Sequence, residues 1–125
     1  MDKKKIFLVE DDQFIVRAYK DSLERAGFEV TVAFDGVEAM EQLKSMTPDL
    51  ILLDIIMPLK NGFEVLSELK IDDRLKNVPV VVLSNLGQDS DIKKGKELGA
   101  VDYMVKANYS MQEVIDKVGQ YLAQG

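Results

Sequence analysis

The chain contains neither cysteine nor histidine. Their absence excludes disulfide bonds, thiolate or imidazole metal ligands, and every mechanism in which Cys or His acts as nucleophile or base. Any metal that this chain binds must therefore be a hard cation held by oxygen ligands.

Long apolar runs and an excess of positive charge are also lacking. No run approaches the roughly 18 residues of a membrane-spanning helix, and the basic start MDKKKIFLVEDD leads into acidic residues rather than the apolar core of a signal peptide. We therefore expect a cytoplasmic protein that does not enter the membrane. The formal net charge of −6 argues against direct binding of nucleic acid phosphates, which depends on clustered Lys and Arg.

The composition is that of one globular domain. The chain has 125 residues, of which 46% are hydrophobic and 30% charged, and it shows no internal repeats, low-complexity stretches or linkers. We expect a single domain over residues 1–125, large enough to bury a core.

Short apolar runs alternate with segments of helical spacing. Five runs are expected to be strands, at residues 5–9, 29–33, 50–53, 78–83 and 100–105. Near-continuous apolar strands that alternate with helices are typical of a parallel sheet covered on both faces. The pattern predicts a doubly wound α/β fold of five βα units.

Residues with capping chemistry stand where these helices should begin. Asp35 precedes Glu38 by three residues and Ser110 precedes Glu113 by three, which predicts two capping boxes. Asp12 stands before the first helix and suits an N-cap.

The fourth helical segment, residues 89–98, is the weakest. It offers only Ile92 and Leu98 as clear apolar anchors and contains Gly95. We expect this helix to be polar and mobile.

Candidate site residues leave the strands at their carboxyl ends, where parallel sheets form their sites. Glu10 and Asp11 follow the first strand, Asp54 the third, Ser84 the fourth and Lys106 the fifth. If the strand order is 2-1-3-4-5, the common flavodoxin-like order, these positions share one edge of the sheet.

The chemistry of this set centres on Asp54, which interrupts the apolar stretch LILLDIIMP and needs partners because burying an unpaired charge is costly. Repulsion among Glu10, Asp11 and Asp54 favours either a raised pKa or a bound cation, and such a site suits Mg²⁺. Ser84 and Lys106 could hold phosphoryl oxygens, leaving one carboxylate as a nucleophile that forms an acyl phosphate.

Four segments in order, VEDD, LLDIIMPLKNG, VVVLS and DYMVK, resemble a response-regulator receiver domain of bacterial two-component signalling, as typified by the chemotaxis response regulator. The resemblance covers the whole chain. It implies a phosphoacceptor that promotes its own phosphotransfer and slow dephosphorylation rather than a conventional enzyme. It also implies a sensor histidine kinase or phosphotransfer protein as the donor.

The resemblance assigns roles to individual residues. Asp54 is expected to be the phosphoacceptor, Asp11 a direct Mg²⁺ ligand, and Glu10 a ligand acting largely through water. The backbone carbonyl of Ile56 is expected to complete the metal site.

The resemblance also implies a switch. Ser84 and Lys106 are expected to bind the phosphoryl group, and Ser84 and Tyr103 to change conformation when it arrives. This would remodel the face formed by the fourth helix, fifth strand and fifth helix, and so signal to an unidentified downstream protein. The expected state is a monomer or a weak, phosphorylation-dependent dimer.

The chain departs from the family pattern at several positions. Ala107 follows Lys106 where the family usually has a proline joined by a cis bond; we expect a trans bond, because a cis bond to a non-proline residue costs about 2.5 to 4 kcal/mol. Ile56 and Leu86 are apolar, and we hypothesise that they shield the acyl phosphate and prolong its life. Asn85 is larger than the usual residue and could hinder the donor or hydrogen-bond the phosphoryl group.

Three alternatives remain. A phosphatase of the haloacid dehalogenase type requires an acidic residue two positions after its nucleophile, where this chain has Ile56. A flavodoxin-like cofactor carrier needs a phosphate-binding loop rich in Ser, Thr and Gly after the first strand, where this chain has acids. A receiver fold could also act as an interaction module without phosphorylation, and Ala107 keeps that reading open.

Overall fold

The computed structural model describes residues 3–124. Its five strands are β1 (Lys5–Val9), β2 (Glu29–Ala33), β3 (Leu50–Leu53), β4 (Val80–Ser84) and β5 (Asp102–Val105). All pair in parallel in the order β2-β1-β3-β4-β5, so the predicted doubly wound, flavodoxin-like fold is confirmed.

The last two strands begin two residues later than predicted. Pro79 has no N–H to donate to a ladder, and β4 begins directly after it. The N–H of Ala100 instead donates to the carbonyl of Gly95, at 3.1 Å, so this residue belongs to the end of the preceding helix rather than to β5.

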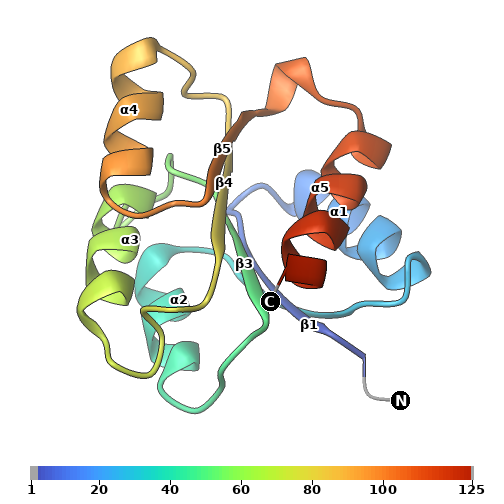
Figure 1. Ribbon diagram of the computed structural model, residues 1–125, viewed down its shortest axis with the longest axis horizontal. Coiled ribbons are helices and arrows are strands. Elements are labelled where there is room, and N and C mark those ends of the chain that lie inside the picture. The colour runs from blue at the N-terminus through green and yellow to red at the C-terminus, as the bar shows by residue number, and fades with distance from the viewer. Residues whose placement is uncertain (1–2, 125) are drawn as a thin grey trace.

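The helices cover both faces of the sheet. They are α1 (Gln13–Arg25), α2 (Gly36–Leu43), α3 (Gly62–Ile71), α4 (Asp89–Glu97) and α5 (Met111–Gln124). Figure 1 shows α1 and α5 on one face and α2, α3 and α4 on the other. Among residues 3–124, no helix is both long and apolar enough to cross a membrane.

Two apolar layers follow from the alternation of side chains along the strands. In β1, Phe7 and Val9 belong to the cluster that packs beneath α2 and α3, whereas Ile6 and Leu8 belong to the cluster beneath α1 and α5. Because both faces of the sheet are covered, the apolar runs of the strands are almost continuous.

Two of the predicted helix caps are confirmed. The Asp12 carboxylate accepts hydrogen bonds from the N–H groups of Phe14 and Ile15, at 2.9 and 3.2 Å. Ser110 and Glu113 form the reciprocal capping box: the Glu113 N–H donates to the Ser110 hydroxyl at 3.1 Å, and the Ser110 N–H to the Glu113 carboxylate at 2.9 Å.

The box predicted at α2 is only half formed. Asp35 accepts from the Glu38 N–H at 2.7 Å, but the Glu38 carboxylate accepts from the N–H of Phe34 rather than that of Asp35. A complete box that the sequence analysis missed begins α3, where Asn61 and Glu64 exchange hydrogen bonds.

Helix α4 has the polar character that was predicted. Gly95 is its one buried residue, and Ile92 is only partly buried against the cluster beneath α2 and α3. The mobility of α4 stays a prediction.

Candidate functional site

Two acids stand at the end of β1. The N–H of Glu10 donates to the carbonyl of Ala33 at 3.0 Å, which holds this residue beside the end of β2. The Glu10 side chain is buried, and its Oε2 accepts from the N–H of Asp12 at 3.0 Å. Asp11 is exposed, so β1 delivers one buried and one exposed carboxylate.

Asp54 follows β3 and is 6% exposed. Its N–H donates to the carbonyl of Val9 at 3.0 Å, and its Oδ1 accepts from the N–H of Ile56 at 3.3 Å. The start of α3 lies directly against this residue, because a Cβ on Gly62 would stand 2.2 Å from the Asp54 carbonyl oxygen. Only glycine at position 62 permits this approach, which fixes the backbone of Asp54 from behind.

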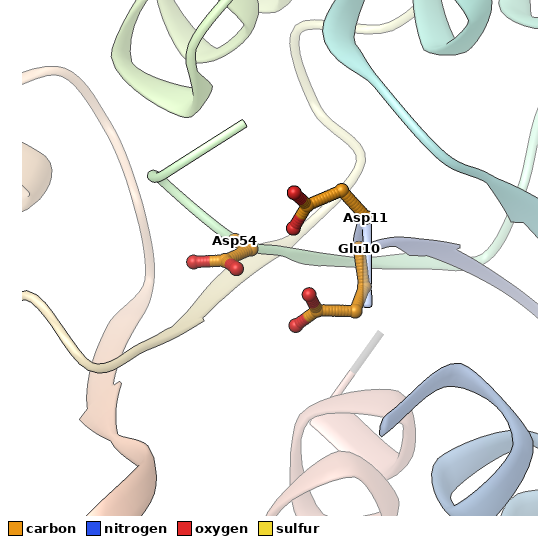
Figure 2. A group of neighbouring side chains, drawn as sticks. All are labelled: Glu10, Asp11 and Asp54. Atoms are coloured by element: carbon orange, nitrogen blue, oxygen red, sulfur yellow. The ribbon is translucent and has the colours of Figure 1, made fainter. Parts of the chain in front are cut away.

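The three carboxylates converge. Glu10, Asp11 and Asp54 each offer an oxygen within 4.8 Å of the others. Figure 2 shows their carboxylate groups facing one small space between the ends of β1 and β3. Three oxygen donors at this spacing fit a hard divalent cation such as Mg²⁺, which takes few protein carboxylates and keeps several waters.

Lys106 supplies the positive charge. Its Nζ donates to Glu10 Oε1 and to Asp54 Oδ2, the second at 3.3 Å. The Lys106–Ala107 peptide bond is trans, as predicted, and a 3₁₀ helix begins at Lys106. Replacing the usual proline therefore does not keep this lysine out of the site.

The ionisation of these groups reflects their crowding. Burial raises the pKa of Glu10 to about 7, and the charge of Asp54 adds to this, against the hydrogen bonds from Lys106 and Asp12. Burial would lower the pKa of Lys106, but its hydrogen bond to Glu10 and the charge of Asp54 outweigh burial and raise it. One ammonium does not offset three carboxylates, and a divalent cation would supply the missing charge.

A pocket of about 200 Å³ opens over these groups. Its lining residues are Glu10, Asp11, Asp12, Ile15, Asp54, Ile56, Asn85 and Lys106. The Ile56 side chain is 57% exposed at this opening. Leu86 does not line the pocket, since it packs against the apolar cluster beneath α2 and α3.

Ser84 and Tyr103 lie behind the pocket rather than in its lining. Ser84 is completely buried, and its hydroxyl accepts from the N–H of Leu86 at 3.2 Å. Tyr103 is 5% exposed, and its hydroxyl donates to the carbonyl of Leu86. The backbone of Leu86 therefore connects the two predicted switch residues. The sequence does not predict this role, because it depends on backbone groups.

Comparison with known proteins agrees with this geometry. The family model of the response regulator receiver domain matches residues 6–118. The alkaline phosphatase synthesis transcriptional regulatory protein PhoP of Bacillus subtilis is 38% identical over 115 residues, which cover 92% of this chain and 47% of the relative. RpaA of Synechocystis, a DNA-binding dual master transcriptional regulator, is 35% identical over 114 residues, covering 91% of this chain and 47% of the relative. The chain thus spans about half the length of these relatives.

Solved structures share the whole fold. The Francisella response regulator 1452 receiver domain superimposes with a TM-score of 0.89 at 31% identity, covering 98% of both chains. The chemotaxis response regulator CheY4 of Vibrio cholerae superimposes with a TM-score of 0.88 at 26% identity, covering 96% of this chain and 99% of that one. With the matched family model spanning most of the sequence, the chain belongs to the response regulator receiver domain family.

Proposed function

We propose that this receiver domain accepts a phosphoryl group onto Asp54 in the presence of Mg²⁺ and passes the signal to a protein partner. One observation carries the proposal: Lys106 contacts both Asp54 and Glu10, while Asp11 completes a cluster of three carboxylates within 4.8 Å. Residues from three separate strand ends make a site that needs a cation and can receive a phosphoryl group.

Asp11, Asp54 and Glu10 would hold the metal, Glu10 largely through water because its two oxygens already accept hydrogen bonds from Lys106 and the Asp12 amide. The backbone carbonyl of Ile56 would be a further ligand. When bound, Mg²⁺ supplies positive charge that offsets the charge of the phosphoryl oxygens. Ser84 and Lys106 would hold the remaining phosphoryl oxygens.

The transfer step needs little from the protein beyond placement. A carboxylate oxygen of Asp54 attacks phosphorus of a phosphohistidine, the O–P bond forms as the N–P bond breaks, and the electron pair of the broken bond returns to the imidazole. The amide of Ile56, which donates to Oδ1, orients the carboxylate for this attack.

The response would travel through Leu86. If the Ser84 hydroxyl turns to the phosphoryl group, it no longer accepts from the Leu86 N–H, and the carbonyl of the same residue is the acceptor for Tyr103. The charge change at Asp54 would thereby bias the position of α4 and β5.

The proposed partners are a sensor histidine kinase or phosphotransfer protein as donor and an unidentified protein as target, both in the cytoplasm. PhoP and RpaA are named as transcriptional regulators, and this chain matches about half of each. We propose that the receiver domain itself binds no nucleic acid, in keeping with its net charge of −6.

The test is intact mass after incubation with acetyl phosphate and Mg²⁺. The wild-type chain should gain one phosphoryl group, and both Asp54→Asn and addition of EDTA should abolish the gain. Asp35→Asn is the matched control, because it makes the same acid-to-amide change at a helix cap where Asn serves equally well. A gain that survives in Asp54→Asn, or no gain together with no Mg²⁺ binding, would contradict the proposal.

The lifetime of the acyl phosphate is a second expectation. Ile56 lines the pocket, so we propose that it slows attack by water, whereas the partly buried Leu86 side chain packs against the cluster beneath α2 and α3 and has no such role. Ile56→Asn should shorten the phosphoryl half-life measured by mass against time, while Leu59→Asn, on the same loop and 80% exposed, should not. A wild-type half-life of seconds would refute this part of the proposal.

A further inference from the structure

Helix α4 leaves a space where a side chain would normally stand. Gly95 is the buried residue of α4, and a Cβ built on it would lie 2.6 Å from Cδ2 and 3.0 Å from Cε2 of Tyr103. Because Cβ atoms essentially never approach other heavy atoms that closely, the Tyr103 ring occupies room that exists only while residue 95 lacks a side chain.

The ring is held in this space at its far end. The Tyr103 hydroxyl donates to the carbonyl of Leu86 in the loop between β4 and α4. Burial raises the pKa of Tyr103 to about 12, and the charges of Asp91 and Asp54 add to this. The buried position is therefore one in which the hydroxyl stays protonated and bound.

Helix α4 has attachments of its own. Ile92 is partly buried against the apolar cluster beneath α2 and α3. In its middle, Lys94 Nζ stands 4.4 Å from the centre of the Phe63 ring on α3. Shifting α4 would disturb the contacts of both Ile92 and Lys94, whereas rotation of the Tyr103 side chain breaks one hydrogen bond, so a side chain at position 95 should displace Tyr103 rather than α4.

We propose that Gly95 is a positioning residue that permits the buried conformation of Tyr103, and that any larger residue there forces the ring outward. The consequence for signalling rests on the proposed function: an outward ring cannot contact Leu86, so Ser84 and Tyr103 would no longer be connected. The pocket around Asp54 does not include Gly95, so phosphoryl uptake should persist.

The chain offers a matched pair of variants. Gly95→Ala and Gly119→Ala make the same change inside a helix, but a Cβ on Gly119 in α5 meets nothing within 4 Å. Only the first should disturb Tyr103. Circular dichroism establishes that each variant is folded.

Nitration with tetranitromethane reports the exposure of tyrosine rings, and the sequence makes the readout specific. Trypsin releases residues 97–106, in which Tyr103 is the one tyrosine, and residues 107–117, in which Tyr109 is the one tyrosine. Both peptides are identical in the wild type and in the two variants. Mass spectrometry then gives the nitration rate of Tyr103 relative to the partly exposed Tyr109 in the same sample.

In the wild type and in Gly119→Ala, Tyr103 should be nitrated more slowly than Tyr109. In Gly95→Ala the Tyr103 rate should rise to that of Tyr109. A folded Gly95→Ala in which Tyr103 stays as protected as in the wild type would overturn the inference. Phosphoryl uptake measured on the same samples separates the two proposals: absence of uptake in the wild type counts against the proposed function, and unchanged nitration counts against the role of Gly95.

A double-mutant cycle covers the case in which Gly95→Ala folds but is too unstable for the nitration experiment. If the clash is with the ring, Gly95→Ala should shift the urea midpoint of unfolding much less in a Tyr103→Ala background than in the wild type. An equal shift in both backgrounds would show that the clash lies elsewhere and would overturn the inference.

Discussion

Helices α4 and α5 are attached to the same sheet in different ways. Helix α5 buries Val114 and Val118, and four more of its apolar residues are partly buried against the cluster that it shares with α1. Helix α4 buries only a glycine. Burial of apolar area stabilises by roughly 25 cal/mol per Å², so α5 is fixed mainly by burial, whereas α4 is attached by the partly buried Ile92, the Tyr103 ring beneath Gly95 and the contact of Lys94 with the Phe63 ring. A helix attached by few buried contacts opens at low free energy cost, which suits the element that the proposed switch would move.

The largest expected effect concerns α5. Val118→Ala removes two fully buried methyl groups and should lower the free energy of unfolding by about 2 kcal/mol, from the lost transfer energy and the cavity left behind. Urea denaturation measures it. Val101→Ala makes the same truncation at a residue that is 44% exposed beside β5, and should cost less than half as much. Equal losses would mean that α5 is no better packed than the surface beside α4.

The second effect compares Tyr103, which lies against α4, with Tyr121, which belongs to α5. The pKa values of Tyr103 and Tyr121 are both raised to about 12, chiefly by burial, and for Tyr121 also by its hydrogen bond to Asp102. Unfolding returns each pKa to about 10, so their contribution to stability is complete below pH 10 and is lost as the pH rises toward 12.

For the buried Tyr103, the free energy of unfolding should be lower at pH 11 than below pH 10 by about 1.4 kcal/mol, the free energy that corresponds to one pKa unit. Unfolding free energies at pH 8 and pH 11 should therefore differ less in Tyr103→Phe than in the wild type. Tyr121 is only partly buried, so Tyr121→Phe should reduce the difference less. If both variants keep the full alkaline loss, neither ring has the environment described above.

The smallest effect concerns the attachment of α4 to α3. Lys94→Ala removes the cation from the face of the Phe63 ring and should cost about 0.5 kcal/mol, as is usual for such contacts at exposed sites. Lys96→Ala, on the same helix, is the control. A loss no greater than that of the control would mean that the contact of Lys94 with the Phe63 ring does not help to attach α4 to α3.

The sequence was sufficient for the elements of the sheet and for the acids at its edge. The spacing of apolar residues and the residues that cap helices are local features of the sequence, so the strands, the Asp12 cap and the Ser110 capping box were predictable. Parallel strands bring Asp11 and Asp54 to one edge of the sheet wherever the helices lie.

The sequence could not predict contacts that arise only from how the folded chain places side chains next to one another. The space at Gly95 exists because an aromatic ring eight residues later turns beneath the helix, and glycine there is otherwise just a weak helix former. Likewise the Glu38 carboxylate could bind either Asp35 or Phe34, and spacing does not decide between two adjacent amides.

The connection through Leu86 has a consequence for mutational scanning. Leu86 joins Ser84 to Tyr103 by its N–H and its carbonyl, groups that alanine retains. Alanine at position 86 would therefore report only the packing of the leucine side chain and would leave the connection between Ser84 and Tyr103 intact. Proline, which has no N–H, would break the bond to Ser84, so only a substitution that changes the backbone would reveal the connection between Ser84 and Tyr103.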